Sequence, residues 1–197
     1  MSLAHTSTGS IVSQSERRSL AEDFAFAALG SALMALCAHV SFPLLFSPVP
    51  LTLQTFGLLV IAFTMGPQRA AAAMVLYLME GAAGLPVFSP ASAAGPGGIA
   101  HLIGPTGGFL MIYPLAAYVA GSFFSLRKNI AFAYLGAIAA TVLFLTSGLL
   151  WFKFTMHVTV AQAFALSVAP FLPGEIIKII AASFAGERTQ KLLARFQ

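Results

Sequence analysis

The sequence predicts an all-α integral membrane protein: a compact bundle of six transmembrane helices with both termini in the cytoplasm. Of its 197 residues, 58% are hydrophobic and only 8% are charged, which is more apolar than a soluble domain of this size requires. At about 20 residues per span plus short turns, the chain has room for some six helices in one domain. Its single cysteine, Cys37, excludes an intramolecular disulfide and is expected to be a thiol in the helical core.

Three segments are expected along the chain. Residues 1–23 are polar and rich in Ser and Thr, which predicts a flexible tail, and they lack the apolar core of a signal peptide. Residues 24–185 form the six-helix membrane domain. Residues 186–197 form a short, basic, amphipathic tail suited to a lipid headgroup surface or to a partner.

The first predicted helix covers residues 24–42, which carry no formal charge. Small side chains recur in it at every fourth position and leave a flat strip against which another helix can pack closely. That second helix belongs either to the same bundle or to a partner protein. The strip consists of Ala27, Ser31 and Ala35, with Ala28 and Ala32 beside them.

An extended turn is predicted for residues 47–54, because its two prolines push the residues before them out of helical geometry. A second helix follows, from about residue 51 to residue 63, and Thr52 and Gln54 lie at its start. Both side chains can donate and accept hydrogen bonds where the span meets water, so they are either solvated surface groups or ligand contacts.

A third, Ala-rich helix is predicted from Arg69 to about Glu80. Tyr77 and Glu80 lie three residues apart near its end, and Glu80 either faces solvent or contributes to a site. The next segment, residues 85–106, contains four prolines and four glycines, so no regular element is expected there. A loop of this length is usually either functional, as a lid or a binding loop, or disordered, and its apolar side chains favour a lid.

Two longer apolar stretches predict the fourth and fifth helices, at residues 107–124 and 130–151, separated by the basic pair Arg127 and Lys128. Residues 158–169 are expected to form an outer half-helix or the top of the sixth helix. This last boundary is open at the level of the sequence.

The sixth helix contains the only two charges between residues 170 and 185, Glu175 and Lys178. Because Pro173 suits the first turn of a helix, Glu175 falls where the helix dipole favours an anion. Lys178 follows three residues later, on the same face. A charge near hydrocarbon costs roughly 2.5–3.5 kcal/mol or more, so the pair indicates a functional site unless it reaches water at the interface.

Basic residues fall on one side of this six-span topology. The N-terminus, the second and fourth turns and the C-terminus together hold eight of them, whereas the opposite side has Lys153 alone. This asymmetry places both termini in the cytoplasm, and it explains the net charge of +4 without nucleic-acid binding. The eight residues are Arg17, Arg18, Arg69, Arg127, Lys128, Arg188, Lys191 and Arg195.

Four motifs occur in order within residues 24–185: residues 47–55 (SPVPLTLQT), 77–88 (YLMEGAAGLPVF), 104–108 (GPTGG) and 171–178 (FLPGEIIK). Together they closely resemble the BioY family, the biotin-specific substrate-binding membrane subunits (S components) of energy-coupling factor (ECF) transporters. The resemblance implies a multi-pass protein of the bacterial inner membrane that captures biotin from outside. Biotin uptake would then require a transmembrane coupling protein (T component) and ABC-type ATPase subunits, although some family members are thought to work without a dedicated energising module.

The resemblance also implies a role for the site residues, except Glu80, whose position matches no shared ligand residue of the family. Glu175 accepts a hydrogen bond from a ureido N–H of biotin, and Lys178 donates to a carbonyl or carboxylate oxygen. The family usually has Asp where Glu175 stands, and the extra methylene moves the carboxylate. Two further polar side chains complete the polar set, and two aromatic ones cover the apolar faces of the ligand. The predicted substrate-binding residues are Thr52, Gln54, Tyr77, Glu80, Phe88, Glu175 and Lys178.

The same resemblance makes the small-residue strip of the first helix, with Ala28 and Ala32, the docking surface for the coupling protein. The sequence contains no Walker-type loop, so ATP hydrolysis is expected from partner subunits, and no cofactor or metal is expected. One alternative is a related subunit for another vitamin. A second is an intramembrane enzyme that uses Glu175 and Lys178 with His157 or His101 as acid and base, but no paired metal ligands of suitable spacing accompany them.

Overall fold

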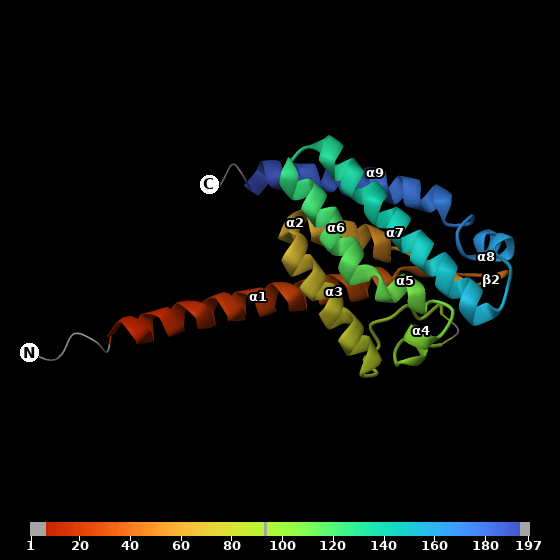
Figure 1. The fold of residues 1–197 in the computed structure, drawn as a ribbon, viewed down its shortest axis with the longest axis horizontal. Coiled ribbons are helices and arrows are strands. Elements are labelled where there is room, and N and C mark those ends of the chain that lie inside the picture. The colour runs from red at the N-terminus through yellow and green to blue at the C-terminus, as the bar shows by residue number, and fades with distance from the viewer. Residues whose placement is uncertain (1–6, 93, 194–197) are drawn as a thin grey trace, which may run out of the picture.

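The computed structural model describes residues 7–92 and 94–193, and most of them are helical (Figure 1). A short antiparallel hairpin lies between the first two helices. The helices are α1 (Ser7–His39), α2 (Gln54–Met65), α3 (Pro67–Ala82), α4 (Ala100–Ile103), α5 (Gly107–Met111), α6 (Tyr113–Leu126), α7 (Ile130–Met156), α8 (Val160–Ser167) and α9 (Leu172–Leu193), and the strands are β1 (Ser41–Leu44) and β2 (Ser47–Thr52).

The long helices pack as a bundle around a main apolar core, and a smaller apolar cluster lies between β2, α5, α7 and α8. Helix α3 packs against α1 and α6, α6 packs against α7, and α9 packs against α2 and α7. Glycines permit these close approaches: a Cβ on Gly121 of α6 would lie 2.8 Å from the backbone of Pro67. On α7, a Cβ at Gly136 would lie 2.7 Å from the carbonyl oxygen of Ala120. Small residues at helix contacts are typical of helices packed within a membrane.

Within the part of the chain that the structure describes, three helical segments are long and apolar enough to cross a membrane: Ser19–His39, Gly107–Leu126 and Ile130–Met156. A fourth span results if α8 and α9, which are bent by 54° at the break between them, count as one. Helix α2, with 12 residues, is shorter than the roughly 20 residues of a full span. The chain is therefore a multi-pass helical membrane protein.

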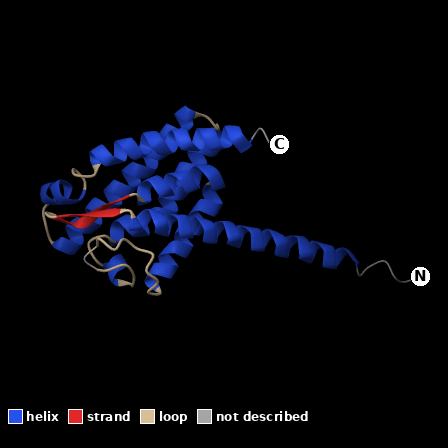
Figure 2. Cartoon of the chain, turned by 180° about the vertical axis from the view of Figure 1, so that it is seen from behind, coloured by secondary structure: helices blue, strands red, loops and turns tan. Residues whose placement is uncertain are grey.

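Both predicted tails are continuous with long helices where the structure describes them. Residues 7–23 are helical and form the first part of α1, which projects beyond the rest of the bundle (Figure 2). No proline interrupts them, so the helix of the following apolar residues extends back through them without a break. At the other end, residues 186–193 continue α9, whereas residues 1–6 and 194–197 lie outside the described part of the chain.

The segment predicted as an extended turn is one strand of a hairpin. Strand β2 pairs antiparallel with β1, in a register that joins Ser41 to Thr52 and Leu44 to Ser47. The register shifts between Phe42 and Leu44, at Pro43, which has no N–H to donate to the ladder. The hairpin delivers the chain to the start of α2 with Thr52 and Gln54 at the junction.

The connections gather at two opposite ends of the bundle (Figure 1). The hairpin, residues 85–106 and α8 lie at one end, called the hairpin end below. The α2–α3 turn, the α6–α7 turn and the C-terminal part of α9 lie at the other. There, an ion pair of 2.7 Å between Arg69 and Asp23 joins α3 to α1.

Candidate ligand-binding cavity

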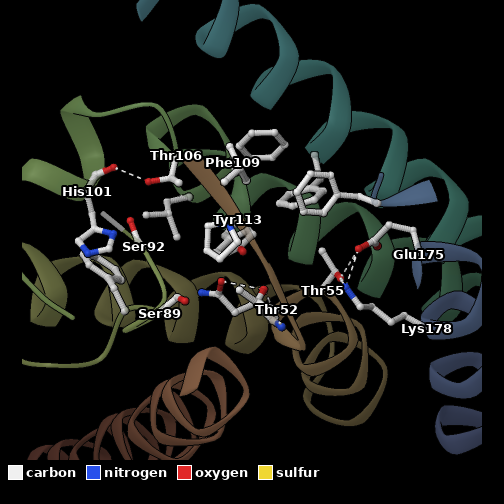
Figure 3. Close-up of a pocket in the computed structure, with 17 residues that line it drawn as sticks. Thr52, Thr55, Ser89, Ser92, His101, Thr106, Phe109, Tyr113, Glu175 and Lys178 are labelled. Atoms are coloured by element: carbon white, nitrogen blue, oxygen red, sulfur yellow. Dashed lines mark hydrogen bonds and ion pairs between the residues drawn. The ribbon is translucent and has the colours of Figure 1, made fainter. Parts of the chain in front are cut away.

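A cavity lies at the hairpin end, with about 520 Å³ of empty space that includes its opening to solvent. Its walls come from β2, the start of α2, residues 85–106, α5, α6, α7 and the start of α9 (Figure 3). Aromatic side chains make up much of the lining, together with a few polar groups. The lining residues are Val49, Pro50, Thr52, Gln54, Thr55, Phe88, Ser89, Ser92, His101, Thr106, Phe109, Leu110, Tyr113, Phe144, Phe171, Glu175 and Lys178.

The charged wall of the cavity is a three-residue network. Lys178 Nζ lies 2.7 Å from Glu175 Oε1 and donates to Thr55 Oγ1 at 3.0 Å, while Thr55 Oγ1 donates to Glu175 Oε1 at 2.9 Å. The side chains of Glu175 and Lys178 are only 3% and 13% exposed. The predicted pair is therefore present and buried, and it does not reach solvent as a surface pair would.

One carboxylate oxygen of Glu175 takes no part in this network. Whereas Oε1 accepts two hydrogen bonds, Oε2 is buried and has no hydrogen-bond partner within residues 7–92 and 94–193. Leaving a buried acceptor unpaired costs about 1–3 kcal/mol, and more for a charged group. A ligand that donates an N–H to this oxygen would offset that cost.

A second network joins the hairpin junction to α3 and to residues 85–106. Thr52 Oγ1 donates to Gln54 Oε1 at 3.0 Å, and Gln54 Nε2 donates to the hydroxyl of Tyr77 at 2.8 Å. The Tyr77 hydroxyl in turn donates to the carbonyl oxygen of Val87 at 3.0 Å. Each of these side chains has a hydrogen-bond partner within the network, so the side chain of Gln54 is held in one orientation.

The described residues between 85 and 106 form a wall of the cavity that is anchored to α3. The N–H of Phe88 donates to the carbonyl of Pro96, and that of Gly98 donates to the carbonyl of Gly81. The ring of Phe88 is fully buried and lies directly over Gly81, where a Cβ would come within 2.0 Å of the ring. His101 also packs against Phe88, and its Nε2 contacts the carbonyl oxygen of Gly95.

The GPTGG motif, residues 104–108, fastens the end of this wall to α7. Trp151 Nε1 donates to the carbonyl of Gly104 at 2.9 Å, and Ser147 Oγ donates to the carbonyl of Gly108 at 2.8 Å. A Cβ at Gly108 would lie 2.2 Å from that of Trp151. The motif thus needs glycine for close packing, and it positions Thr106 and Phe109 in the cavity.

Five of the seven predicted substrate-binding residues line the cavity: Thr52, Gln54, Phe88, Glu175 and Lys178. Tyr77 does not line it, because its buried side chain lies behind Gln54 and holds that residue by its hydroxyl.

Glu80 also lies elsewhere. Its carboxylate accepts a hydrogen bond from Ser31 Oγ of α1, so it links α3 to α1 and is absent from the lining. Tyr77 and Glu80 are three residues apart on α3, but their side chains have different partners: Tyr77 contacts Gln54 behind the cavity wall, and Glu80 contacts α1.

Several lining residues were not predicted. Thr55 and Thr106 lie within the motifs at residues 47–55 and 104–108, so these motifs could have identified them as site residues. Tyr113 and Phe144 stack at 5.8 Å between ring centroids and form an apolar wall, but nothing in the sequence distinguishes them from core aromatics. Ser89 and Ser92 line the cavity because of the way in which the 85–106 segment folds.

The small-residue strip of α1 faces two ways. Ala27 and Ser31 are buried within the chain itself, at 7% and 0% exposure, so neither side chain is accessible on the surface of this chain. Neighbouring helices of the same bundle, with Glu80 of α3 among their side chains, already cover them. Ala32 is exposed and Ala28 is half-buried, so both remain accessible to a partner, as does the half-buried Ala35.

Comparison with known proteins identifies the family. The model of the BioY family matches residues 8–195, nearly the whole chain. The chain belongs to the BioY family. A BioY relative from Pyrococcus horikoshii, named a probable biotin transporter, is 34% identical over 86% of this chain and 97% of its own. The biotin transporter BioY of Thermotoga maritima is 32% identical over 84% of this chain and 94% of its own.

A solved structure shares the fold of this BioY chain. The S-component for biotin from an ECF-type ABC transporter matches it with a TM-score of 0.78, over 88% of this chain and 93% of that one. Sequence identity in this match is 23%. The resemblance inferred from the four motifs is thus confirmed at the level of family and fold.

Proposed function

We propose that this BioY protein takes up biotin, which it binds in the cavity at the hairpin end as the S component of an ECF-type transporter. Two relatives that are 32–34% identical to this chain are named as a biotin transporter or a probable one, which supports this ligand. So does the likeness of fold to a biotin S-component. The protein itself would then be the capture subunit, and partner ATPases would supply the energy.

The observation that carries the proposal is the buried Glu175–Lys178 pair in the cavity wall, with Glu175 Oε2 unpaired among the described residues. Biotin offers two ureido N–H donors, one carbonyl acceptor, an apolar thiophane ring and a carboxylate. Glu175 Oε2 is suited to a ureido N–H, and the aromatic lining to the apolar ring. In a cavity that excludes water, these few hydrogen bonds discriminate strongly against ligands that lack the matching groups.

Six spans are the topology that best accounts for this bundle. They would be α1, α2, α3, the α5–α6 pair, α7 and α9, with α2 and α3 shorter than the rest. Short spans are compatible with a bilayer that thins locally around the protein. Under this topology, both termini lie on the same side.

The cavity would open to the outside of the cell. Arg69, Arg127, Lys128, Arg188 and Lys191 all belong to the end of the bundle opposite the cavity. A cytoplasmic excess of Lys and Arg is the general rule for membrane proteins. Under the same rule the termini would lie in the cytoplasm, and the membrane would be the inner one if the cell has two.

The T component would dock on the exposed part of the α1 strip, at Ala28 and Ala32. An Ala32→Trp variant should still bind biotin as purified protein but lose biotin uptake in cells, since a bulky side chain prevents close helix packing. Ala181→Trp, at an exposed alanine of α9, is the matched control and should retain both. Equal uptake by the two variants would argue against docking at Ala32.

Ligand identity is tested by competition. Labelled biotin bound to the purified protein should be displaced by unlabelled biotin and not by other vitamins such as thiamine or riboflavin at the same concentration. Preferential displacement by another vitamin would assign the cavity to that vitamin instead. Cells that lack their own biotin uptake should also accumulate labelled biotin when they produce this chain together with its partners.

A further inference from the structure

Two buried polar atoms of the cavity lack a hydrogen-bond partner in the part of the chain that the structure describes: Glu175 Oε2 and Ser89 Oγ. Both residues line the cavity and are at most 5% exposed. They come from opposite walls, Glu175 from the start of α9 and Ser89 from residues 85–106 (Figure 3). The cavity therefore has a second polar pole, remote from the charged pair.

The other polar side chains that the 85–106 segment contributes to the cavity are already engaged by backbone. Thr106 Oγ1 donates to the carbonyl of His101, and the His101 ring contacts the carbonyl of Gly95. Ser92 Oγ accepts from the N–H of Ala94. These contacts hold the 85–106 segment in shape. A buried hydroxyl without such a contact is costly, and because the Ser89 hydroxyl belongs to the cavity lining, a ligand in the cavity could offset that cost.

The Ser89 hydroxyl is also held in position. The residue follows Phe88, whose N–H donates to Pro96 and whose ring packs against Gly81 of α3. One residue further back, the carbonyl of Val87 accepts from the Tyr77 hydroxyl. A donor fixed before the ligand arrives loses little freedom on binding, which favours affinity.

The charged pole restricts which end of a ligand it accepts. Glu175 Oε2 is an acceptor and requires a donor, whereas a ligand carboxylate beside it would meet a second negative charge. At the opposite pole, a serine hydroxyl donates readily to a carboxylate. The two poles thus suit a ligand with N–H groups at one end and a carboxylate at the other.

We propose that Ser89 is a ligand-binding residue that donates a hydrogen bond to the carboxylate of biotin while the ureido ring faces Glu175. This inference rests on the proposed binding of biotin. It assigns both an orientation of the ligand and a residue that selects for an acidic tail.

The test compares two ligands on two serine variants. Ser89→Ala removes the proposed donor, while Ser183→Ala removes another buried hydroxyl that lacks a partner among the described residues but does not line the cavity. The ligands are biotin and biotinol, in which a primary alcohol replaces the carboxylate. Dissociation constants are measured on the purified protein in detergent, and melting curves verify that each variant is folded.

Ser89→Ala should weaken biotin binding by roughly 10–150-fold, the loss expected for one hydrogen bond to a charged group. Biotinol binding should fall by less than about fivefold, and Ser183→Ala should bind both ligands like the parent protein. Ser89→Ala should fold as well as the parent, because no intramolecular hydrogen bond of its side chain is lost within the described residues.

Three results would overturn the inference while leaving biotin as the ligand: unchanged binding by Ser89→Ala, an equal loss for biotin and biotinol, or an equal loss in Ser183→Ala. The second would mean that Ser89 contacts a part of biotin other than the carboxylate. If the parent protein binds no biotin, the proposed function is itself rejected, and the inference with it.

Discussion

The buried charge pair can be tested by removing its cation alone. In Lys178→Met, a neutral side chain of similar length replaces the lysine, and Glu175 keeps only the hydrogen bond from Thr55. A carboxylate that is 3% exposed then lacks its counter-ion. Removing one partner of a buried ion pair typically costs about 3–5 kcal/mol, because the remaining charge is left uncompensated.

That cost converts into a change in melting temperature. At roughly 2–4 °C per kcal/mol for a chain of this size, Lys178→Met should melt about 6–20 °C below the parent protein. Adding Glu175→Gln removes the second charge and keeps an acceptor for Thr55. The double variant should therefore regain most of the lost melting temperature, since replacing a buried pair by neutral groups is often close to neutral.

Biotin binding should behave differently from stability. Single and double variants alike lack part of the charged recognition site, so both should bind biotin at least tenfold more weakly than the parent. Melting curves in detergent and equilibrium binding of labelled biotin are measured on the same preparations. A double variant that binds biotin like the parent would show that the pair is purely structural, and an unchanged melting temperature in Lys178→Met would refute the electrostatic reasoning.

Three further substitutions have distinct expected outcomes. Gly81→Ala places a methyl group within 2.0 Å of the Phe88 ring, so it should displace the 85–106 wall and weaken biotin binding at least tenfold. Tyr77→Phe removes the hydroxyl that joins Gln54 to Val87, two hydrogen bonds of about 1 kcal/mol each, and should weaken binding by about tenfold in a folded protein. Glu80→Gln should leave biotin binding within about threefold of the parent, because the side chain contacts α1 and not the cavity.

Each of these is checked by titration with labelled biotin. Gly174→Ala is the control for Gly81→Ala, because a Cβ there meets nothing within 4 Å, and it should bind normally. Parent-like affinity in Gly81→Ala or Tyr77→Phe would mean that the wall does not need these contacts. A large loss of biotin affinity in Glu80→Gln would indicate that Glu80 contributes to the ligand site.

The charged wall of the site was predictable because its geometry is local. Pro173 marks the start of the helix, and the spacing of three residues sets Glu175 and Lys178 on one face. The structure contains that pair, with 2.7 Å between Nζ and Oε1. Contacts that a single helix determines can be read from spacing alone.

Contacts between distant segments were not predictable in the same way. Glu80 lies only three residues from Tyr77, and the sequence does not say which of the two turns toward α1 and which toward the cavity. Ser89 reaches the cavity because backbone hydrogen bonds such as that from Gly98 to Gly81 fold the 85–106 segment back on α3. Such pairings depend on the tertiary fold.

The hairpin was missed for a different reason. Pro48 and Pro50 predicted an extended turn, because they push the residues before them out of helical geometry, and proline, which cannot donate to a ladder, gave no signal for a strand. In a sheet of only two strands, each strand has one paired side, so N–H groups on the other side are not needed for pairing. A strand rich in proline is therefore compatible with this position, where it positions Thr52 and Gln54.

The central claim is that this single chain captures biotin in the cavity at the hairpin end. The most direct test is equilibrium binding of labelled biotin to the purified chain in detergent, without partner subunits, alongside Glu175→Ala and Lys178→Ala. Saturable binding of one biotin per chain, strongly weakened by both substitutions, is the predicted result. Absence of binding by the folded parent protein, or full binding by both variants, would contradict the claim.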